Sequence, residues 1–159
     1  MTCVWIVSLF LSSCAPGQIF GPTMTFTPVT QTFTINVPAN TLWFDTGIKI
    51  VKGQDVTIQA TGNVKTRKNS DNDADGQTTF FCDDAPCHLP RAYYGALMGR
   101  LAGWIPFRIY TACYFTAPVS GALFLAFKDW SIEDNVGEFI VTVTVRQLAE
   151  YRLHNSVLC

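Results

Sequence analysis

The chain has 159 residues, of which 48% are hydrophobic and only 14% charged, and its formal net charge is −1 at pH 7. This length fits one domain of roughly 100 to 150 residues with extensions, and the composition excludes a disordered polymer. Nucleic acid is not expected as a partner, because no overall positive field attracts a polyanion.

Residues 1–14 form an apolar run that is shorter than the roughly 20 residues of a membrane span but suits a signal segment. The run ends in Leu11–Cys14 (LSSC), which resembles the lipobox of bacterial lipoproteins. The resemblance implies a lipid anchor on Cys14 and an outer-membrane lipoprotein that faces the periplasm or the exterior. Because the segment contains no Lys or Arg, the alternatives are a buried N-terminal strand or a truncated start.

Residues 15–30 contain three prolines and two glycines without periodicity and are typical of a tether or irregular arm. From residue 31 to 146, apolar residues alternate with polar ones in short runs separated by turn residues, which indicates strands. The predicted strands lie around 33–37, 48–50, 56–60, 96–101, 107–110, 113–116, 122–127 and 139–145.

No stretch before residue 147 shows a helical period, so the sequence predicts an all-β fold. We expect a two-sheet antiparallel β-sandwich, jelly-roll-like, with about eight strands. The C-terminal segment 147–159 forms a tail or a short helix, which is too brief to be stable unless it docks.

Six cysteines suit an exported protein. If a signal segment removes Cys3 and Cys14 is acylated, four remain. Cys82 and Cys87 close a short loop, and Cys113 with Cys159 would be the remaining pair, although spacing alone leaves the connectivity open. A zinc site at Cys82 and Cys87 is the rival interpretation, but it lacks a second ligand pair.

The sequence offers no catalytic constellation. His88 and His154 are its only histidines, and neither accompanies a nucleophile motif. Asp83 and Asp84 are adjacent carboxylates of the kind that usually shape a tight turn. We therefore expect a binding domain and not an enzyme.

Two acidic loops are candidates for calcium, which takes six to eight oxygen ligands. The first, Asp71–Gly76 (DNDADG), opens like an EF-hand loop but has Cys82 where the bidentate Glu is needed. A solvated insertion is the stronger interpretation of this loop, and a different type of calcium loop is the weaker one.

The second loop, Lys128–Gly137 (KDWSIEDNVG), lies between two predicted strands and holds three carboxylates and an amide. Trp130 adds an apolar face of the kind that stacks on a sugar ring. The alternative is a plain hairpin, in which Asp134 and Asn135 serve the turn geometry and Trp130 packs inward.

Several segments together resemble the small calcium-dependent galactose-binding lectins of bacteria. Together they span roughly residues 35 to 146. In chain order they are LWFDTGI (42–48), KGQDVTIQATG (52–62), CDDAPC (82–87), GALMGRL (95–101) with IPF (105–107), and residues 117–127 with the hairpin loop that follows. The resemblance implies a galactose-binding-like β-sandwich.

In these lectins one calcium ion bridges the protein and two sugar hydroxyls. By resemblance the side-chain ligands here are Asp129, Asp134 and Asn135. Trp130, Ser131 and Gln77 complete the candidate ligand-binding residues. The loop is about two residues shorter than in the galactose binders, and the family's His–Gln sugar contacts have no clear equivalents, so galactose is not predicted.

These features favour an envelope-associated, non-catalytic binding domain that binds carbohydrate with calcium. The alternative is a docking subunit of an outer-membrane or secretion-system assembly, in which residues 15–30 and 147–159 contact envelope protein partners. The sequence leaves the oligomeric state open.

Overall fold

The computed structural model describes residues 28–66, 71–82 and 91–147. These residues form twelve strands and no helix, and none of them forms a helical segment that could cross a membrane. The strands are β1 (Val29–Pro38), β2 (Phe44–Ile50), β3 (Asp55–Thr61), β4 (Val64–Lys65), β5 (Asp71–Asn72), β6 (Gln77–Cys82), β7 (Ala92–Tyr94), β8 (Leu97–Leu101), β9 (Phe107–Arg108), β10 (Ala112–Thr116), β11 (Gly121–Phe127) and β12 (Val136–Gln147).

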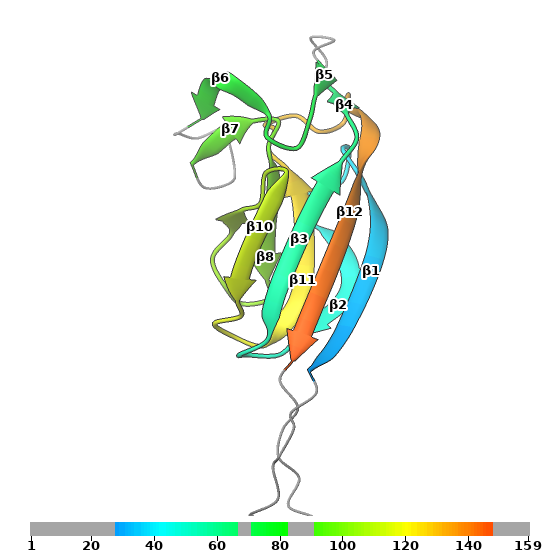
Figure 1. Ribbon diagram of the computed structural model, residues 1–159. Coiled ribbons are helices and arrows are strands. Elements are labelled where there is room, and N and C mark those ends of the chain that lie inside the picture. Colours follow the sequence, from blue (N-terminus) through cyan, green and yellow to red (C-terminus); the bar gives the residue numbers. More distant parts are fainter. Residues whose placement is uncertain (1–27, 67–70, 83–90, 148–159) are drawn as a thin grey trace, which may run out of the picture.

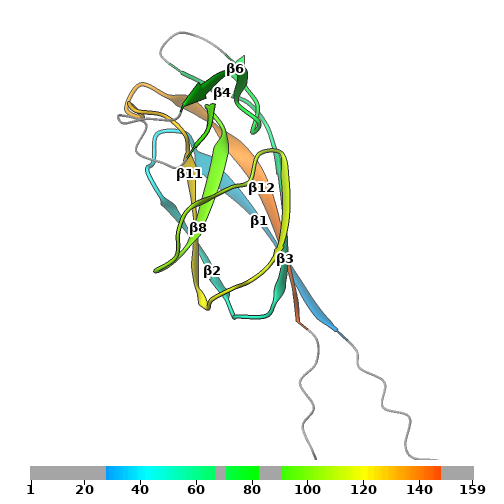
Figure 2. The same ribbon diagram turned by 90° about the vertical axis from the view of Figure 1, so that its left-hand side faces the viewer.

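Two antiparallel sheets face each other as the layers of a sandwich (Figure 2). The first has the order β10-β3-β12-β4-β5, with β1 also paired to β12, and the second has the order β2-β11-β8-β9. A separate hairpin of β6 and β7 lies beside one end of the sandwich (Figure 1). The prediction of an all-β sandwich is therefore confirmed.

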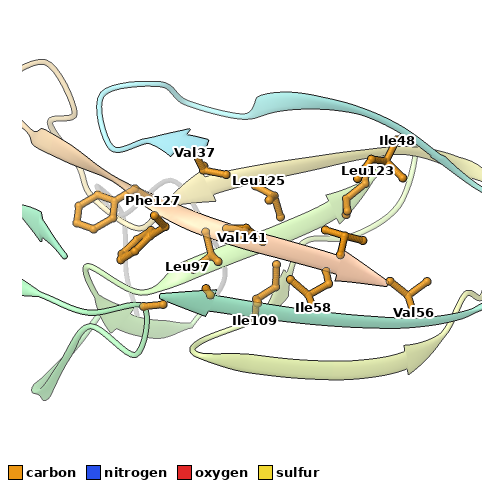
Figure 3. Packing of buried hydrophobic residues seen from close by; sticks show 14 of the residues in the cluster. Val37, Ile48, Val56, Ile58, Leu97, Ile109, Leu123, Leu125, Phe127 and Val141 are labelled. Carbon is orange, nitrogen blue, oxygen red and sulfur yellow. The ribbon is translucent and has the colours of Figure 1, made fainter. Parts of the chain in front are cut away.

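The core lies between the two sheets, where inward-facing residues alternate with outward-facing ones. On β12 the residues Phe139, Val141, Val143 and Val145 are at most 4% exposed, as their shared face in the sequence predicts. They meet residues such as Leu123 and Leu125 from the opposite sheet (Figure 3). Burial of these apolar side chains is the main favourable contribution to folding.

All eight predicted strands are present, but the structure adds four that the sequence did not indicate: β4, β5, β6 and β7. β4 and β5 are two residues long, β7 is three residues long, and β6 carries exposed residues over most of its length, so none of the four has a period-2 pattern long enough to indicate a strand. β1 begins at Val29, inside the predicted arm, because its register with β12 continues to Gln147.

β12 sets the long axis of the sandwich. It runs about 35 Å from Val136 to Gln147, at about 3.3 Å per residue. Its last residue pairs with Val29, the first residue of β1, so the described chain enters and leaves at one end. The β6–β7 hairpin lies at the other end (Figure 1).

Candidate functional site

The loop between β11 and β12 carries the residues that the sequence singled out, and its start is held firmly. The Lys128 N–H donates to the Ala96 carbonyl at 2.9 Å, and the Gly95 N–H donates to the Lys128 carbonyl at 2.7 Å. These bonds continue the β11–β8 pairing beyond Phe127. The loop therefore leaves the sheet at the same end as β6 and β7.

Asp129 is buried, with only 3% of its surface exposed. Its Oδ1 accepts the Ser131 N–H at 3.2 Å, which tightens the start of the loop. The Tyr94 hydroxyl also donates a hydrogen bond to this carboxylate, and the Thr66 hydroxyl donates to the Tyr94 oxygen. Asp129 is thus a buried acid fixed by donors from the loop itself and from β7.

The pKa of the Tyr94 phenol is raised well above its usual value. Burial is the largest cause, followed by the hydrogen bond to Asp129 and the negative charge of that carboxylate. Asp134 adds a smaller electrostatic effect in the same direction. Tyr94 therefore remains a protonated donor to Asp129 at physiological pH.

Asn135 closes the loop and is 5% exposed. Its Nδ2 donates to the Ala39 carbonyl at 3.3 Å, which ties the loop to the end of β1, and its backbone N–H donates to Ile132 at 3.2 Å. Its Oδ1 is buried and has no hydrogen-bond partner in the part of the chain that the structure describes. A buried amide oxygen without a partner costs about 1–3 kcal/mol, so it is the type of atom that a ligand satisfies.

The donor set fits a hard cation in its chemistry. Asp129, Asp134 and Asn135 offer carboxylate and amide oxygens, which calcium prefers, and the unsatisfied Oδ1 of Asn135 is one of them. Among the described residues, no three His, Cys, Asp or Glu side chains group closely enough to hold a metal ion. A cation here would therefore depend on the amide and on backbone oxygens as well as on the acids.

A hollow of about 330 Å³ opens beside this loop, lined by Gln77, Thr79, Phe80, Tyr94 and Trp130. The Trp130 ring lies 4.9 Å from the Tyr94 ring and 6.3 Å from the Phe80 ring, measured between centroids. Trp130 and Phe80 remain 42% and 44% exposed. The structure therefore places two residues from distant parts of the sequence, Gln77 and Trp130, on one aromatic-walled surface.

Gly76 brings Gln77 next to Tyr94. A Cβ at Gly76 would lie 2.5 Å from the Tyr94 carbonyl oxygen, and the residue has a φ of +75°, so only glycine allows this approach. Gln77 is the register partner of Tyr94 in the β6–β7 hairpin. The pairing of β6 with β7 therefore places Gln77, which lines the hollow, beside Tyr94, whose hydroxyl donates to Asp129.

Comparison with solved structures finds the same fold in a lectin. The N-terminal domain of EclA, described as a PllA-like lectin, superposes with a TM-score of 0.56 and 24% sequence identity, covering 72% of this chain and 95% of that one. The chain has a lectin-like β-sandwich fold. No protein-family model and no curated protein matches the sequence.

The first acidic loop differs from the solvated insertion expected from its composition. Asp71 and Asp73 are exposed, but Asn72 and Ala74 are only 2% and 1% exposed, and the Asp75 carboxylate accepts the Thr111 N–H at 2.7 Å. That expectation is wrong for the middle of the loop, because a short apolar side chain there packs into the core.

Cys113 is a free, half-buried thiol, so the predicted pairing with Cys159 is wrong for this structure. The reason is its direction: Cys113 lies on the inward face of β10 and packs against the core. Cys82 is disulfide-bonded, but its partner lies outside the described residues, so Cys82–Cys87 stays a prediction. Cys14 and both arms also lie mostly outside them, and their roles stay predictions.

Sequence reasoning missed Tyr94, Phe80 and Thr66. Tyr94 belongs to a three-residue strand and Phe80 to an irregular one, so neither stood out from the pattern. Thr66 follows the short strand β4 and is 4% exposed. Tyr94 bonds to Asp129, Phe80 packs against Trp130, and Thr66 bonds to Tyr94, and only the folded chain reveals these contacts.

Proposed function

We propose that this chain is a non-catalytic carbohydrate-binding domain whose site lies around Asp129, Asn135 and Trp130. The observation that carries the proposal is the buried Oδ1 of Asn135, which has no hydrogen-bond partner among the described residues. It lies in the same loop as Trp130, which lines an aromatic-walled hollow of a lectin-like sandwich. Aromatic faces stack on the apolar faces of sugar rings, and buried polar groups supply orientation. Both kinds of group meet at this end of the molecule.

The proposal includes calcium. Asp129, Asp134 and Asn135 would hold the ion, which when bound supplies a positive centre for sugar hydroxyls. Tyr94 keeps the Asp129 carboxylate in place by donating its phenolic proton. Trp130, Gln77 and Ser131 would contact the sugar, with Trp130 as the stacking surface and Gln77 as an amide donor and acceptor.

The test is calorimetry with calcium followed by glycan-array binding with and without EDTA. We expect one calcium site per chain and glycan binding that EDTA abolishes and added calcium restores. Glycan binding that persists in EDTA would contradict the role of calcium but not of the hollow. The absence of both calcium uptake and any glycan signal would contradict the proposal as a whole.

We further propose that the domain is displayed from a membrane by a lipid on Cys14. The candidate site lies at the opposite end of the sandwich from Val29, where the N-terminal segment enters, so an anchored domain would present the site outward. Metabolic labelling with a palmitate analogue should mark the wild type and not the variant Cys14→Ser. Labelling of both proteins would contradict the anchor.

A further inference from the structure

A second hollow lies on the open side of the sandwich, between the edge strands β9 and β10 of the two sheets. It measures about 270 Å³, and its lining includes Leu101, Trp104, Phe107, Arg108, Cys113 and Phe115. Below it is called the β9–β10 hollow. It lies near the start of β11, since Leu101 pairs with Leu123, whereas the Asp129 loop follows the end of that strand.

Three aromatic side chains, Trp104, Phe107 and Phe115, line the β9–β10 hollow. The Phe107 and Phe115 rings meet edge to face, with centroids 4.9 Å apart at 60°, and Leu101 is fully buried behind them. Trp104 is 43% exposed at the rim. An aromatic ring bound here could pack against these side chains in the offset-stacked or edge-to-face arrangements that aromatic pairs favour.

Among residues 28–66, 71–82 and 91–147, Arg108 is the single ionised side chain that lines the β9–β10 hollow, and no carboxylate lines it. Arg108 forms no ion pair with that part of the chain. A guanidinium is a planar fork of donors that binds a carboxylate through two parallel hydrogen bonds. The hollow therefore suits a ligand that carries one anionic group on an apolar ring system.

We propose that the β9–β10 hollow is a second binding site, for a small aromatic carboxylate whose ring enters between Phe107, Phe115 and Trp104 and whose carboxylate meets Arg108. The volume suits this class: a cavity of about 150 Å³ holds benzene, and drug-sized ligands need about 300 Å³ or more. One or two fused rings with a single carboxylate therefore match about 270 Å³. The site does not depend on carbohydrate binding.

The test is calorimetric titration of the full chain with 2-naphthoate and with its neutral counterpart 2-naphthamide. We expect 2-naphthoate to bind at one site. Arg108→Gln should weaken 2-naphthoate about tenfold and leave 2-naphthamide unchanged, because it removes only the charge-assisted bonds. Arg146→Gln, at an exposed arginine on β12, is the matched control and should change neither affinity.

Cys113 provides an independent readout, since its half-buried thiol lines the same hollow. Bound 2-naphthoate should slow alkylation of the Cys113-containing peptide, measured by mass spectrometry, and EDTA should not alter this protection. The proposal is overturned if the folded chain binds no 2-naphthoate up to its solubility limit, if Arg108→Gln and Arg146→Gln behave alike, or if Cys113 is not protected. Failure of glycan binding would leave all three results unaffected.

Discussion

The two hollows of this sandwich differ in the polar groups around them. Every buried polar or charged side chain of the described residues lies on the segments that meet at the Asp129 end; these side chains are Thr66, Asn72, Lys128, Asp129 and Asn135. None of them lines the β9–β10 hollow, whose polar lining consists of a thiol, one exposed threonine and one exposed arginine. Buried polar groups cost stability unless they are hydrogen-bonded or bind a ligand, so this concentration distinguishes the end of the molecule where we propose the ligand site.

The largest expected effect comes from changing the charge of Asp129. Asp129→Asn keeps the shape and removes the negative charge, so it should weaken calcium binding about 100-fold by calorimetry, since ligand charge sets calcium affinity. Glu133→Gln is the matched control, because Glu133 lies in the same loop but is exposed. It should change the affinity less than about twofold if electrostatic attraction at an exposed carboxylate is screened. Equal losses in both variants would show that only the net charge of the loop matters.

Variants at Asn135 test whether its Oδ1, which has no hydrogen-bond partner among the described residues, binds the calcium ion. Asn135→Leu removes the unsatisfied Oδ1 together with the bond to Ala39. In EDTA we expect the free energy of unfolding to change by no more than about 1 kcal/mol, because the two losses oppose each other. Calcium affinity should nevertheless fall at least about tenfold, as expected for a lost ligand.

Asn135→Asp provides the complementary variant. It places a charge where the orphaned oxygen lies, so it should destabilise the protein in EDTA, and calcium should restore more stability than it gives the wild type. Urea unfolding with and without calcium measures both variants. If calcium stabilises neither variant differently from the wild type, Asn135 is not a ligand.

Substitution of the two exposed tryptophans, one in each hollow, tests whether the two proposed sites bind independently. Trp130→Ala should weaken glycan binding about tenfold, from the loss of a stacking interaction of about 1.4 kcal/mol, and leave 2-naphthoate binding unchanged. Trp104→Ala should do the reverse. Titration of both variants with both ligands completes the comparison, and loss of both ligands in either variant would mean that the two hollows are not independent.

The sandwich was predictable because the alternation of apolar and polar residues along its strands reflects which side chains face the core. Phe139, Val141, Val143 and Val145 alternate with outward residues, and each is buried as expected. The sequence also singled out the Asp129 loop, since clustered oxygen donors between two strands are visible in a sequence. It did not single out Tyr94, because Tyr94 belongs to a short, irregular hairpin that leaves no periodic signal.

Cys113 shows the second reason for failure. Its pairing depended on which way the side chain points, and the inward face of β10 follows from the register with β3, in which Cys113 lies opposite Ile58. That register is a long-range property of the folded sheet. The β9–β10 hollow was missed for the same reason, because its walls come from strands of different sheets.

The smallest effect concerns Tyr94 and depends on pH. Burial and the bond to Asp129 raise its pKa in the folded state, so the unfolded chain loses this proton first. The contribution is therefore complete below about pH 10, the usual pKa of tyrosine, and is lost as the pH rises above it. For one proton the free energy of unfolding declines by at most about 1.4 kcal/mol per pH unit.

Urea unfolding between pH 8 and 11 measures this decline, which Tyr94→Phe should remove in part. Tyr114→Phe is the control, because Tyr114 is 66% exposed on β10 and its substitution should leave the pH profile unchanged. If Tyr94→Phe keeps the wild-type profile, the proton on Tyr94 does not stabilise Asp129. If it removes the decline, the hydrogen bond from Tyr94 to Asp129 contributes to the stability of the folded chain.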